Sequence, residues 1–261
     1  MPGAILSPVA ETVRRHDPDR FLASLFAAPE RREALFTLYA FNHELARARE
    51  VASEPLLGLI RLQWWREVVE GTAKRHEVAT PLAAALEAGL LPRTVLLEMI
   101  AGREAAESPA DHAAWRGYLA ATAGALAEAA GYALAGNQAP AARLRGLGMA
   151  YGVAGQLRSV AVLAAQGRCL LPEAVLAAHG TSSHAITAGR DAAAVQAAIA
   201  ELAQTGRDLL RAHAGRLPRA VLAAALPAVL ARRDLRHPGV LAPRGLGDRL
   251  AVLAAAALGR V

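Results

Sequence analysis

The stretch GLGMAYGVAGQLRSVAVLAAQ, residues 146–166, decides the fold class of this chain. Its only charged residue is Arg158, and the other residues are apolar, small or polar, so a helix here should be buried almost all round. Such a helix lies inside a bundle and must be covered by other helices. A lone buried guanidinium needs an anion or a set of carbonyls, because an unpaired buried charge costs several kcal/mol.

Outward from this stretch, the chain is a succession of helical segments divided by proline, glycine and small polar residues. The segment 180–189 (GTSSHAITAG) is rich in turn formers, and no Ser/Gly linker or internal repeat divides the chain. We therefore expect a single domain over residues 1–261. The expected helices are 18–28, 29–50, 53–70, 81–90, 92–106, 110–135, 139–166, 172–178, 190–214, 218–232 and 248–258.

The composition supports an all-α fold. Alanine supplies 65 of the 261 residues and aromatic residues only 4%, which favours closely packed helices and excludes an all-β fold. The net charge is +6, and Lys74 is the only lysine, but acidic residues are interspersed with the arginines. The chain contains no block of like charges, so its sequence does not predict a nucleic-acid partner. The single cysteine, Cys169, excludes an internal disulfide and a cysteine-based zinc site.

Two separated motifs resemble the signatures of the squalene/phytoene synthase family. The first is RREALFTLYAFNHELARARE (31–50) followed by GLIRLQWWREVVEG (58–71), and the second is LRSVAVLAAQGRCLLP (157–172). The resemblance extends over residues 21–176. It implies an all-α bundle of the isoprenoid-synthase type with a central cavity. In that family, aspartates on two facing helices hold Mg²⁺ ions while two prenyl diphosphates condense head to head.

The chain departs from the first signature of the family at the metal-binding positions. Tyr39, Ala40 and Phe41 match, but His43 stands where the family has an arginine. The family's paired aspartates are replaced by alanine and arginine at 46 and 47, and Glu50 is the acid that remains.

The second signature has lost its acids as well. Leu157 and Arg158 match it, while Ser159 and Leu163 stand in place of aspartates. Since Mg²⁺ requires several hard oxygen ligands, we expect no catalytic residue, no metal site and no cofactor. The chain would then be a pseudoenzyme of this family.

Within the family, the detailed resemblance is to the assembly-factor branch for respiratory complex I. The pattern AFN-x-ELA at 40–46, SE at 53–54 and GL-x-R-x-Q-x-W at 58–65 carries it. The branch implies a non-catalytic factor whose partners are complex I subunits or other assembly factors. It also implies a place in the cytoplasm or the equivalent mitochondrial matrix, with peripheral contact to the inner membrane left open.

Two other functions remain open at this point. The first is a divergent head-to-head transferase of farnesyl or geranylgeranyl diphosphate in isoprenoid biosynthesis, which would need Mg²⁺ and carboxylates from elsewhere, such as Glu128 or Asp191. The second is a module that holds a prenyl lipid or quinone in the cavity without reacting it. No window of 18 uncharged apolar residues predicts a membrane span, and the first 20 residues do not predict a secretory signal.

The candidates for a residual pocket or anion site follow from the two signatures. An internal salt bridge of Arg158 or Arg168 with Glu50 or Glu173 is equally consistent with the pattern. For Asn42 and Glu44 we favour a buried hydrogen-bond pair that joins two helices. For His43 we favour a cavity-lining or core position. The full set of candidates for a residual pocket or an anion site is Tyr39, Asn42, His43, Arg47, Glu50, Arg158 and Arg168.

Arg61, Trp64 and Arg66 are candidates for a partner-binding surface, because tryptophan and arginine dominate binding hot spots. Adjacent helical residues point about 100° apart. We therefore place Trp65 in the core and leave Trp64 open. Cys169 is expected to be a buried, inert thiol. The last helix, 248–258, is expected to complete the bundle, with a position on an anionic bilayer as the other interpretation.

Overall fold

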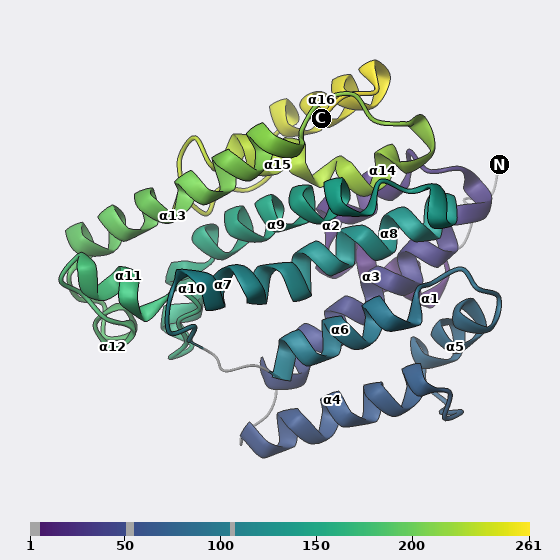
Figure 1. Ribbon diagram of the computed structural model, residues 1–261, viewed down its shortest axis with the longest axis horizontal. Helices are drawn as coiled ribbons and strands as arrows, with labels where there is room; N and C mark the ends of the chain where they lie inside the picture. The colour runs from purple at the N-terminus through teal and green to yellow at the C-terminus, as the bar shows by residue number, and fades with distance from the viewer. Residues whose placement is uncertain (1–5, 51–54, 105–107) are drawn as a thin grey trace.

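Helix α9 (Ala141–Arg158) runs through the middle of the molecule, and other helices cover it (Figure 1). Helices α8, α13 and α15 and the π-helical turn η1 pack against it. The positions of α9 that face these helices are buried, as the near-absence of charge in residues 146–157 predicts. The prediction is wrong for residues 159–166, none of which is buried. The computed structural model describes residues 6–50, 55–104 and 108–261, with the backbone alone at residues 49, 50 and 55.

The expected all-α fold is confirmed, and within the described residues β pairing is limited to one isolated bridge between Arg216 and Arg260. The π-helical turn η1 (Ala120–Gly124) joins α7 to α8, and η2 (Gly136–Gln138) and η3 (Arg219–Val221) are 3-10 turns. The other α-helices are α1 (Pro8–His16), α2 (Pro18–Ser24), α3 (Pro29–Glu50), α4 (Pro55–Glu70), α5 (Ala79–Glu87), α6 (Arg93–Glu104), α7 (His112–Leu119), α8 (Ala125–Ala135), α10 (Val160–Ala165), α11 (Glu173–Ala178), α12 (Ser183–Thr187), α13 (Ala192–His213), α14 (Leu222–Ala225), α15 (Pro227–Asp234) and α16 (Leu246–Leu258).

The prediction missed or merged several helices. Helix α1 was not expected, although Ser7 caps it by accepting a hydrogen bond from Ala10 N–H at 3.2 Å. The segment 180–189 contains the short helix α12. The expected helix 139–166 ends at Arg158 and resumes as α10, which has no buried residue. The expected helix 218–232 is divided because Pro227 has no N–H to continue α14.

Small residues allow α9 to approach its neighbours closely. A Cβ atom added at Gly148 would collide with the carbonyl oxygen of Ala123 and lie 2.5 Å from the Cβ of Ala127. A Cβ at Gly152 would lie 2.7 Å from the Cβ of Ala123. The glycine positions of α9 thus set the distance between this helix and the η1–α8 segment.

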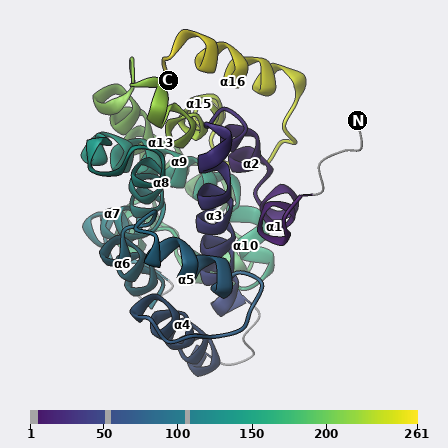
Figure 2. The same cartoon turned by 90° about the vertical axis from the view of Figure 1, so that its right-hand side faces the viewer.

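Two helices lie at opposite ends of the bundle. Figure 2 shows α16 across the outside of the molecule beyond α15, and α4 at the far end. No described helix combines the length and the hydropathy that a membrane span requires. The bundle therefore presents two separate outer surfaces, one built on α4 and one on α16.

A pair of glycine substitutions on α9 tests the close approach. We expect Gly148→Ala to lower the free energy of unfolding by about 1–3 kcal/mol, because the backbone of Ala123 cannot easily move away. Gly155→Ala, on the same helix but with open space at its Cβ position, should raise it by about 0.5–1 kcal/mol. Urea unfolding followed by circular dichroism measures both. Equal effects of the two substitutions would contradict this packing.

Candidate functional site

Arg158, the arginine of the second signature, is held inside the protein at the end of α9. Its Nη2 donates to the carbonyl oxygen of Ala242 at 2.7 Å, and its Nη1 lies 3.5 Å from Oδ2 of Asp234 on α15. The side chains of Arg158 and Asp234 are 15% and 11% exposed. The expected internal salt bridge is present, but its described partner is Asp234. Glu173 instead accepts from the backbone N–H of Ser183 at 3.4 Å.

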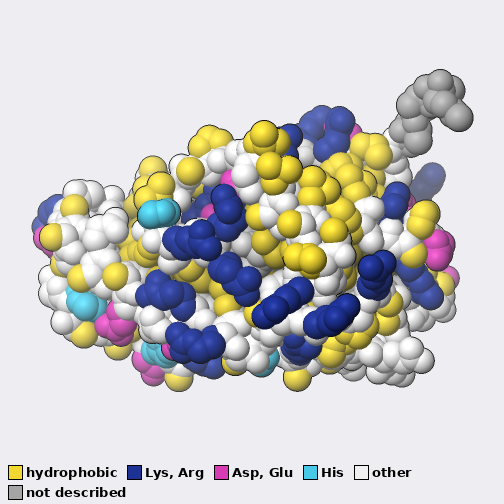
Figure 3. Space-filling view, turned by 90° about the horizontal axis from the view of Figure 1, so that it is seen from above, with side chains coloured by type: hydrophobic (Ala, Val, Ile, Leu, Met, Phe, Trp, Pro, Cys, Tyr) yellow, Lys and Arg dark blue, Asp and Glu magenta, His cyan; other side chains and the backbone are white. Residues whose placement is uncertain are grey.

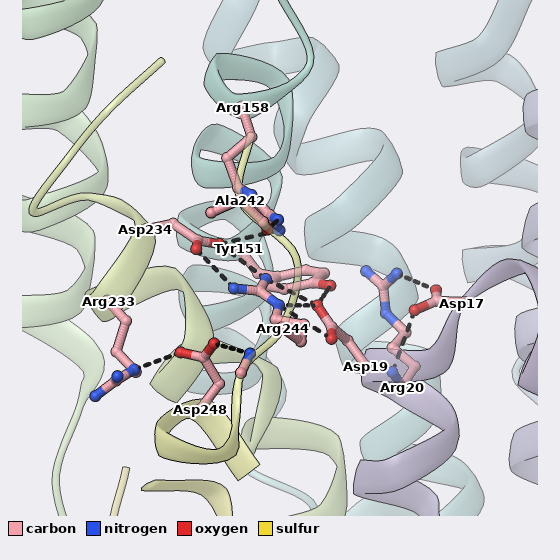
Figure 4. A network of polar contacts seen from close by, with 11 residues as sticks. Asp17, Asp19, Arg20, Tyr151, Arg158, Arg233, Asp234, Ala242, Arg244 and Asp248 are labelled. Atoms are coloured by element: carbon pink, nitrogen blue, oxygen red, sulfur yellow. Dashed lines mark hydrogen bonds and ion pairs between the residues drawn. The ribbon is translucent and has the colours of Figure 1, made fainter. Parts of the chain in front are cut away.

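Asp234 also binds Arg244, in the loop that precedes α16. The guanidinium of Arg244 donates to Asp234 at 2.6 and 2.9 Å and to Oδ2 of Asp19, on α2, at 2.8 and 3.0 Å. The hydroxyl of Tyr151 on α9 donates to the same oxygen of Asp19 at 2.9 Å. Figure 4 shows how these side chains connect α2, α9, α15 and the loop. We call Asp19, Tyr151, Arg158, Asp234 and Arg244 the Arg244 network.

The Arg244 network is electrostatically self-contained. Burial alone would lower the pKa of Arg244, but its hydrogen bonds with Asp234 and Asp19 outweigh burial and raise that pKa above the ordinary value. Burial, together with the nearby carboxylates, raises the pKa of Tyr151 well above its ordinary value. Arg244 therefore finds its counter-charges in Asp19 and Asp234.

The candidates of the first signature lie on different faces of helix α3 and contact different helices. Tyr39 is buried, and the guanidinium of Arg20 on α2 lies 5.6 Å from its ring centroid. Burial raises the pKa of Tyr39 above its ordinary value. Asn42 accepts from Nη2 of Arg103, on α6, at 3.4 Å, so it joins two helices as expected. Neither side chain points to a shared anion site.

His43 stacks against His16 of α1, with ring centroids 4.2 Å apart. Its Nε2 is buried and has no hydrogen-bond partner in the described part of the chain. Burial, and then the neighbouring His16, lower the pKa of His43 below its ordinary value, so the imidazole is uncharged at neutral pH. Glu50 belongs to α3, but its side chain lies outside the described residues.

Arg47, Arg61 and Trp64 meet at one pocket of about 310 Å³ between α3, α4 and the loop after α4. Arg47 is 48% exposed and lies 3.7 Å from Glu44. The pocket thus unites one residual-pocket candidate with two partner-surface candidates. The residues that line it are Glu44, Arg47, Ala48, Arg61, Trp64, Trp65 and His76.

Two tryptophans form the wall of this α3–α4 pocket. Trp65 is 4% exposed and packs edge-on against Phe41, so its predicted core position is confirmed. Trp64 is half-buried, with its ring centroid 4.8 Å from that of Trp65 and the ammonium of Lys74 5.1 Å away. His76 packs against both indoles, with ring centroids 5.8 and 5.4 Å away. Sequence reasoning missed His76 and Lys74, because they lie in a loop that matches no motif.

Arg66, the third partner-surface candidate, is partly exposed and is held by a carboxylate of its own chain. Its Nη2 donates to both carboxylate oxygens of Glu104, each at 2.8 Å, and so joins α4 to α6. The outer surface of α4 is instead apolar beside Arg61 and Trp64. It exposes Leu56, Leu57, Leu59 and Ile60, which are 63%, 43%, 39% and 56% accessible.

The remaining candidates offer little reactive chemistry. Arg168 and Cys169 lie after α10, beside a space too narrow to admit a water molecule. Burial raises the pKa of the Cys169 thiol, as expected for an inert cysteine. Glu128 accepts from Nε of Arg145 at 2.6 Å, and Asp191 accepts from the hydroxyl of Thr181 at 3.3 Å. In the described ranges, no three His, Cys, Asp or Glu side chains are grouped so that they could hold a metal ion.

The sequence model of squalene/phytoene synthases matches residues 13–237. The chain belongs to the squalene/phytoene synthase family. Among curated proteins it is 34% identical over 98 residues to human "NADH dehydrogenase (ubiquinone) complex I, assembly factor 6", covering 36% of this chain and 29% of that protein. Its identity to the Bos taurus protein of the same name is 36% over 76 residues, which cover 29% of this chain and 23% of that protein. The chain therefore matches these family members over less than a third of their length.

Two solved structures share the fold of this family member. A dehydrosqualene synthase in complex with ligand superposes with a TM-score of 0.77 at 15% identity, covering 96% of this chain and 94% of that one. Squalene synthase HpnC from Alicyclobacillus acidocaldarius superposes with a TM-score of 0.64 at 18% identity, covering 96% of this chain and 92% of that one. The expected isoprenoid-synthase type of bundle is confirmed, and so is the resemblance to the assembly-factor branch.

The Arg244 network should be a major source of stability. We expect Asp234→Asn to lower the free energy of unfolding by about 3 kcal/mol, because it leaves two arginines without part of their counter-charge. The matched control is Asp208→Asn, whose carboxylate pairs with the exposed Arg211 at 2.8 Å. It should change stability by less than about 1 kcal/mol. Urea unfolding compares them, and similar small losses in both variants would show that the network is not structural.

Proposed function

We propose that this chain is a non-catalytic member of its family that acts in the assembly of respiratory complex I. The observation that carries the proposal is the 34% identity with human assembly factor 6 over 98 residues, which is 36% of this chain. The two synthases that share the fold cover 96% of the chain but are only 15% and 18% identical to it. Two of the segments that resemble the assembly-factor branch lie on the helices that form the α3–α4 pocket: residues 40–46 on α3 and residues 58–65 on α4. Residues 53–54 lie outside the described residues.

The side chains at the signature positions support a non-catalytic role. Ala46, Arg47, Ser159 and Leu163 supply no carboxylate where the family's pattern has aspartates. Mg²⁺ is bound through hard oxygen ligands, and the half-exposed guanidinium of Arg47 adds positive charge instead. Arg158 is already paired with Asp234. We accordingly propose no catalytic residue, no metal and no cofactor.

The outer face of α4 is the proposed docking surface for a complex I subunit or another assembly factor. Four exposed aliphatic side chains lie there beside Arg61 and Trp64. An apolar patch with a tryptophan and an arginine at its edge has the composition of a protein-binding hot spot. This interaction would place the protein on the cytoplasmic or matrix-equivalent face of the inner membrane.

A complementation experiment tests this proposal. Cells that lack the gene should lose most of their assembled complex I, measured by native gel electrophoresis and by NADH–quinone activity of membranes, and the wild-type gene should restore it. The variant Leu57→Ser with Ile60→Ser should fail to restore it and should retain complex I subunits about tenfold more weakly in co-purification.

The matched control is Leu25→Ser with Val162→Ser, which changes two similarly exposed aliphatic residues away from α4 and should restore complex I fully. Undiminished complex I in cells without the gene would refute the assembly role. Full activity of the α4 variant would refute the docking surface alone.

A further inference from the structure

The net positive charge of the chain comes from its last 55 residues. Residues 207–261 contain ten arginines and three aspartates, whereas residues 1–206 contain 19 basic and 20 acidic residues. Each of the three aspartates already pairs with an arginine. The pairs are Asp208 with Arg211 at 2.8 Å, Asp234 with Arg244 at 2.6 Å and Asp248 with Arg233 at 2.6 Å.

Several of these arginines meet in a groove between α13, α15 and α16. The groove has a volume of about 920 Å³ and is open to solvent, and no Asp or Glu is among its lining residues. Its floor is apolar and includes Leu210, Val229 and Leu235. Figure 3 looks onto this side of the molecule, where Lys and Arg side chains gather among hydrophobic ones. The arginines that line the groove are Arg207, Arg211, Arg232, Arg236 and Arg260.

Three of the groove arginines lack an acidic partner. Arg232, Arg236 and Arg260 are exposed, and no described carboxylate lies within 4.0 Å of their guanidinium nitrogens. Arg207 is oriented by the carbonyl oxygen of Leu235, to which its Nη1 donates at 3.1 Å. Several guanidinium groups around one groove repel one another until an anion enters. Guanidinium groups bind phosphate oxygens through paired hydrogen bonds.

The outer side of α16 is apolar. Leu246, Leu250 and Leu253 follow a helical spacing and are 72%, 54% and 48% exposed. Val240 and Leu241, in the preceding loop, are 57% and 55% exposed. A helix with an exposed aliphatic stripe beside a cluster of arginines has the make-up of a helix that lies in the plane of a membrane interface.

We propose that the groove between α13, α15 and α16, together with the outer leucines of α16, binds the surface of an anionic phospholipid bilayer. The leucines of α16 enter the boundary of the acyl chains, and the groove arginines bind the lipid phosphates. The two contacts reinforce each other, since binding of an interfacial helix increases with both the buried apolar area and the attraction of its basic residues to anionic lipids. The convex leucine stripe favours a bilayer over an acidic protein segment, which would bind in the groove and leave the stripe exposed. This proposal does not rest on the role in complex I assembly.

Co-sedimentation of the full chain with vesicles tests the proposal. One set of vesicles contains phosphatidylcholine alone, and the other contains phosphatidylcholine mixed with phosphatidylglycerol. We expect binding to the anionic vesicles, little binding to the neutral ones, and loss of binding at about 0.5 M salt, where the Debye length is a few ångströms. Leu250→Ser with Leu253→Ser should also weaken binding, which a purely electrostatic contact would not show.

The arginine variants locate the contact. Arg232→Gln with Arg236→Gln should lower the partition coefficient roughly 30-fold, since each arginine near an anionic surface contributes about 1 kcal/mol. The control Arg93→Gln with Arg116→Gln removes the same charge from exposed positions outside the groove and should lower it by no more than about threefold. Helical circular dichroism confirms that each variant is folded.

Several results would overturn the proposal. Equal binding to neutral and anionic vesicles, or equal losses in the groove variant and its control, would show that the groove does not bind the bilayer. Absence of vesicle binding, combined with a rise in melting temperature in inorganic phosphate that Arg232→Gln with Arg236→Gln removes, would indicate a small-anion site. Absence of vesicle binding combined with binding of an acidic amphipathic peptide would indicate a protein partner.

Discussion

Two largely buried carboxylates, Asp19 and Asp234, hold the arginines Arg158 and Arg244, and the arrangement of the bundle depends on these ion pairs. They connect α2 near the start of the chain with the end of α9, with α15 and with the loop before α16. Asp19 and Arg244 are 225 residues apart in sequence. The contacts therefore fix where the last helix lies relative to the first helices.

The same network holds Arg158, the arginine of the second signature. Arg158 lies where the family has a motif arginine, and its charge is matched by Asp234 while the carbonyl of Ala242 takes another of its donors. On α3, His43 is uncharged at neutral pH because of burial and the adjacent His16. Arg158 and His43 are thus both engaged in contacts within the chain. Other arginines remain exposed, among them those that line the groove beside α16.

The sequence predicted the helices whose ends carry clear signals, and it predicted much less about contacts across the chain. Helices α3 and α4 begin at Pro29 and Pro55, and proline is favoured in the first turn of a helix. The need of Arg158 for an internal partner followed from its apolar surroundings. Its partner did not, because Asp234 lies 76 residues away and neither residue belongs to a motif that includes the other.

The candidate site shows the same division. Trp65 could be placed in the core from helical geometry, whereas the ion pair of Arg66 with Glu104 could not be predicted, because Glu104 lies on another helix. The α3–α4 pocket unites residues from two motifs with His76, whose position depends on the path of a loop. Periodicity predicts which side of a helix is buried, but it does not predict which distant side chain lies opposite.

The most direct test of a non-catalytic role is an assay for diphosphate release. The purified protein is incubated with farnesyl diphosphate or geranylgeranyl diphosphate, with and without Mg²⁺. The account predicts no release above a protein-free control, because Ala46, Arg47, Ser159 and Leu163 offer no carboxylate to a metal ion. Mg²⁺-dependent release that Glu50→Gln abolishes would contradict the account and would make the protein an enzyme.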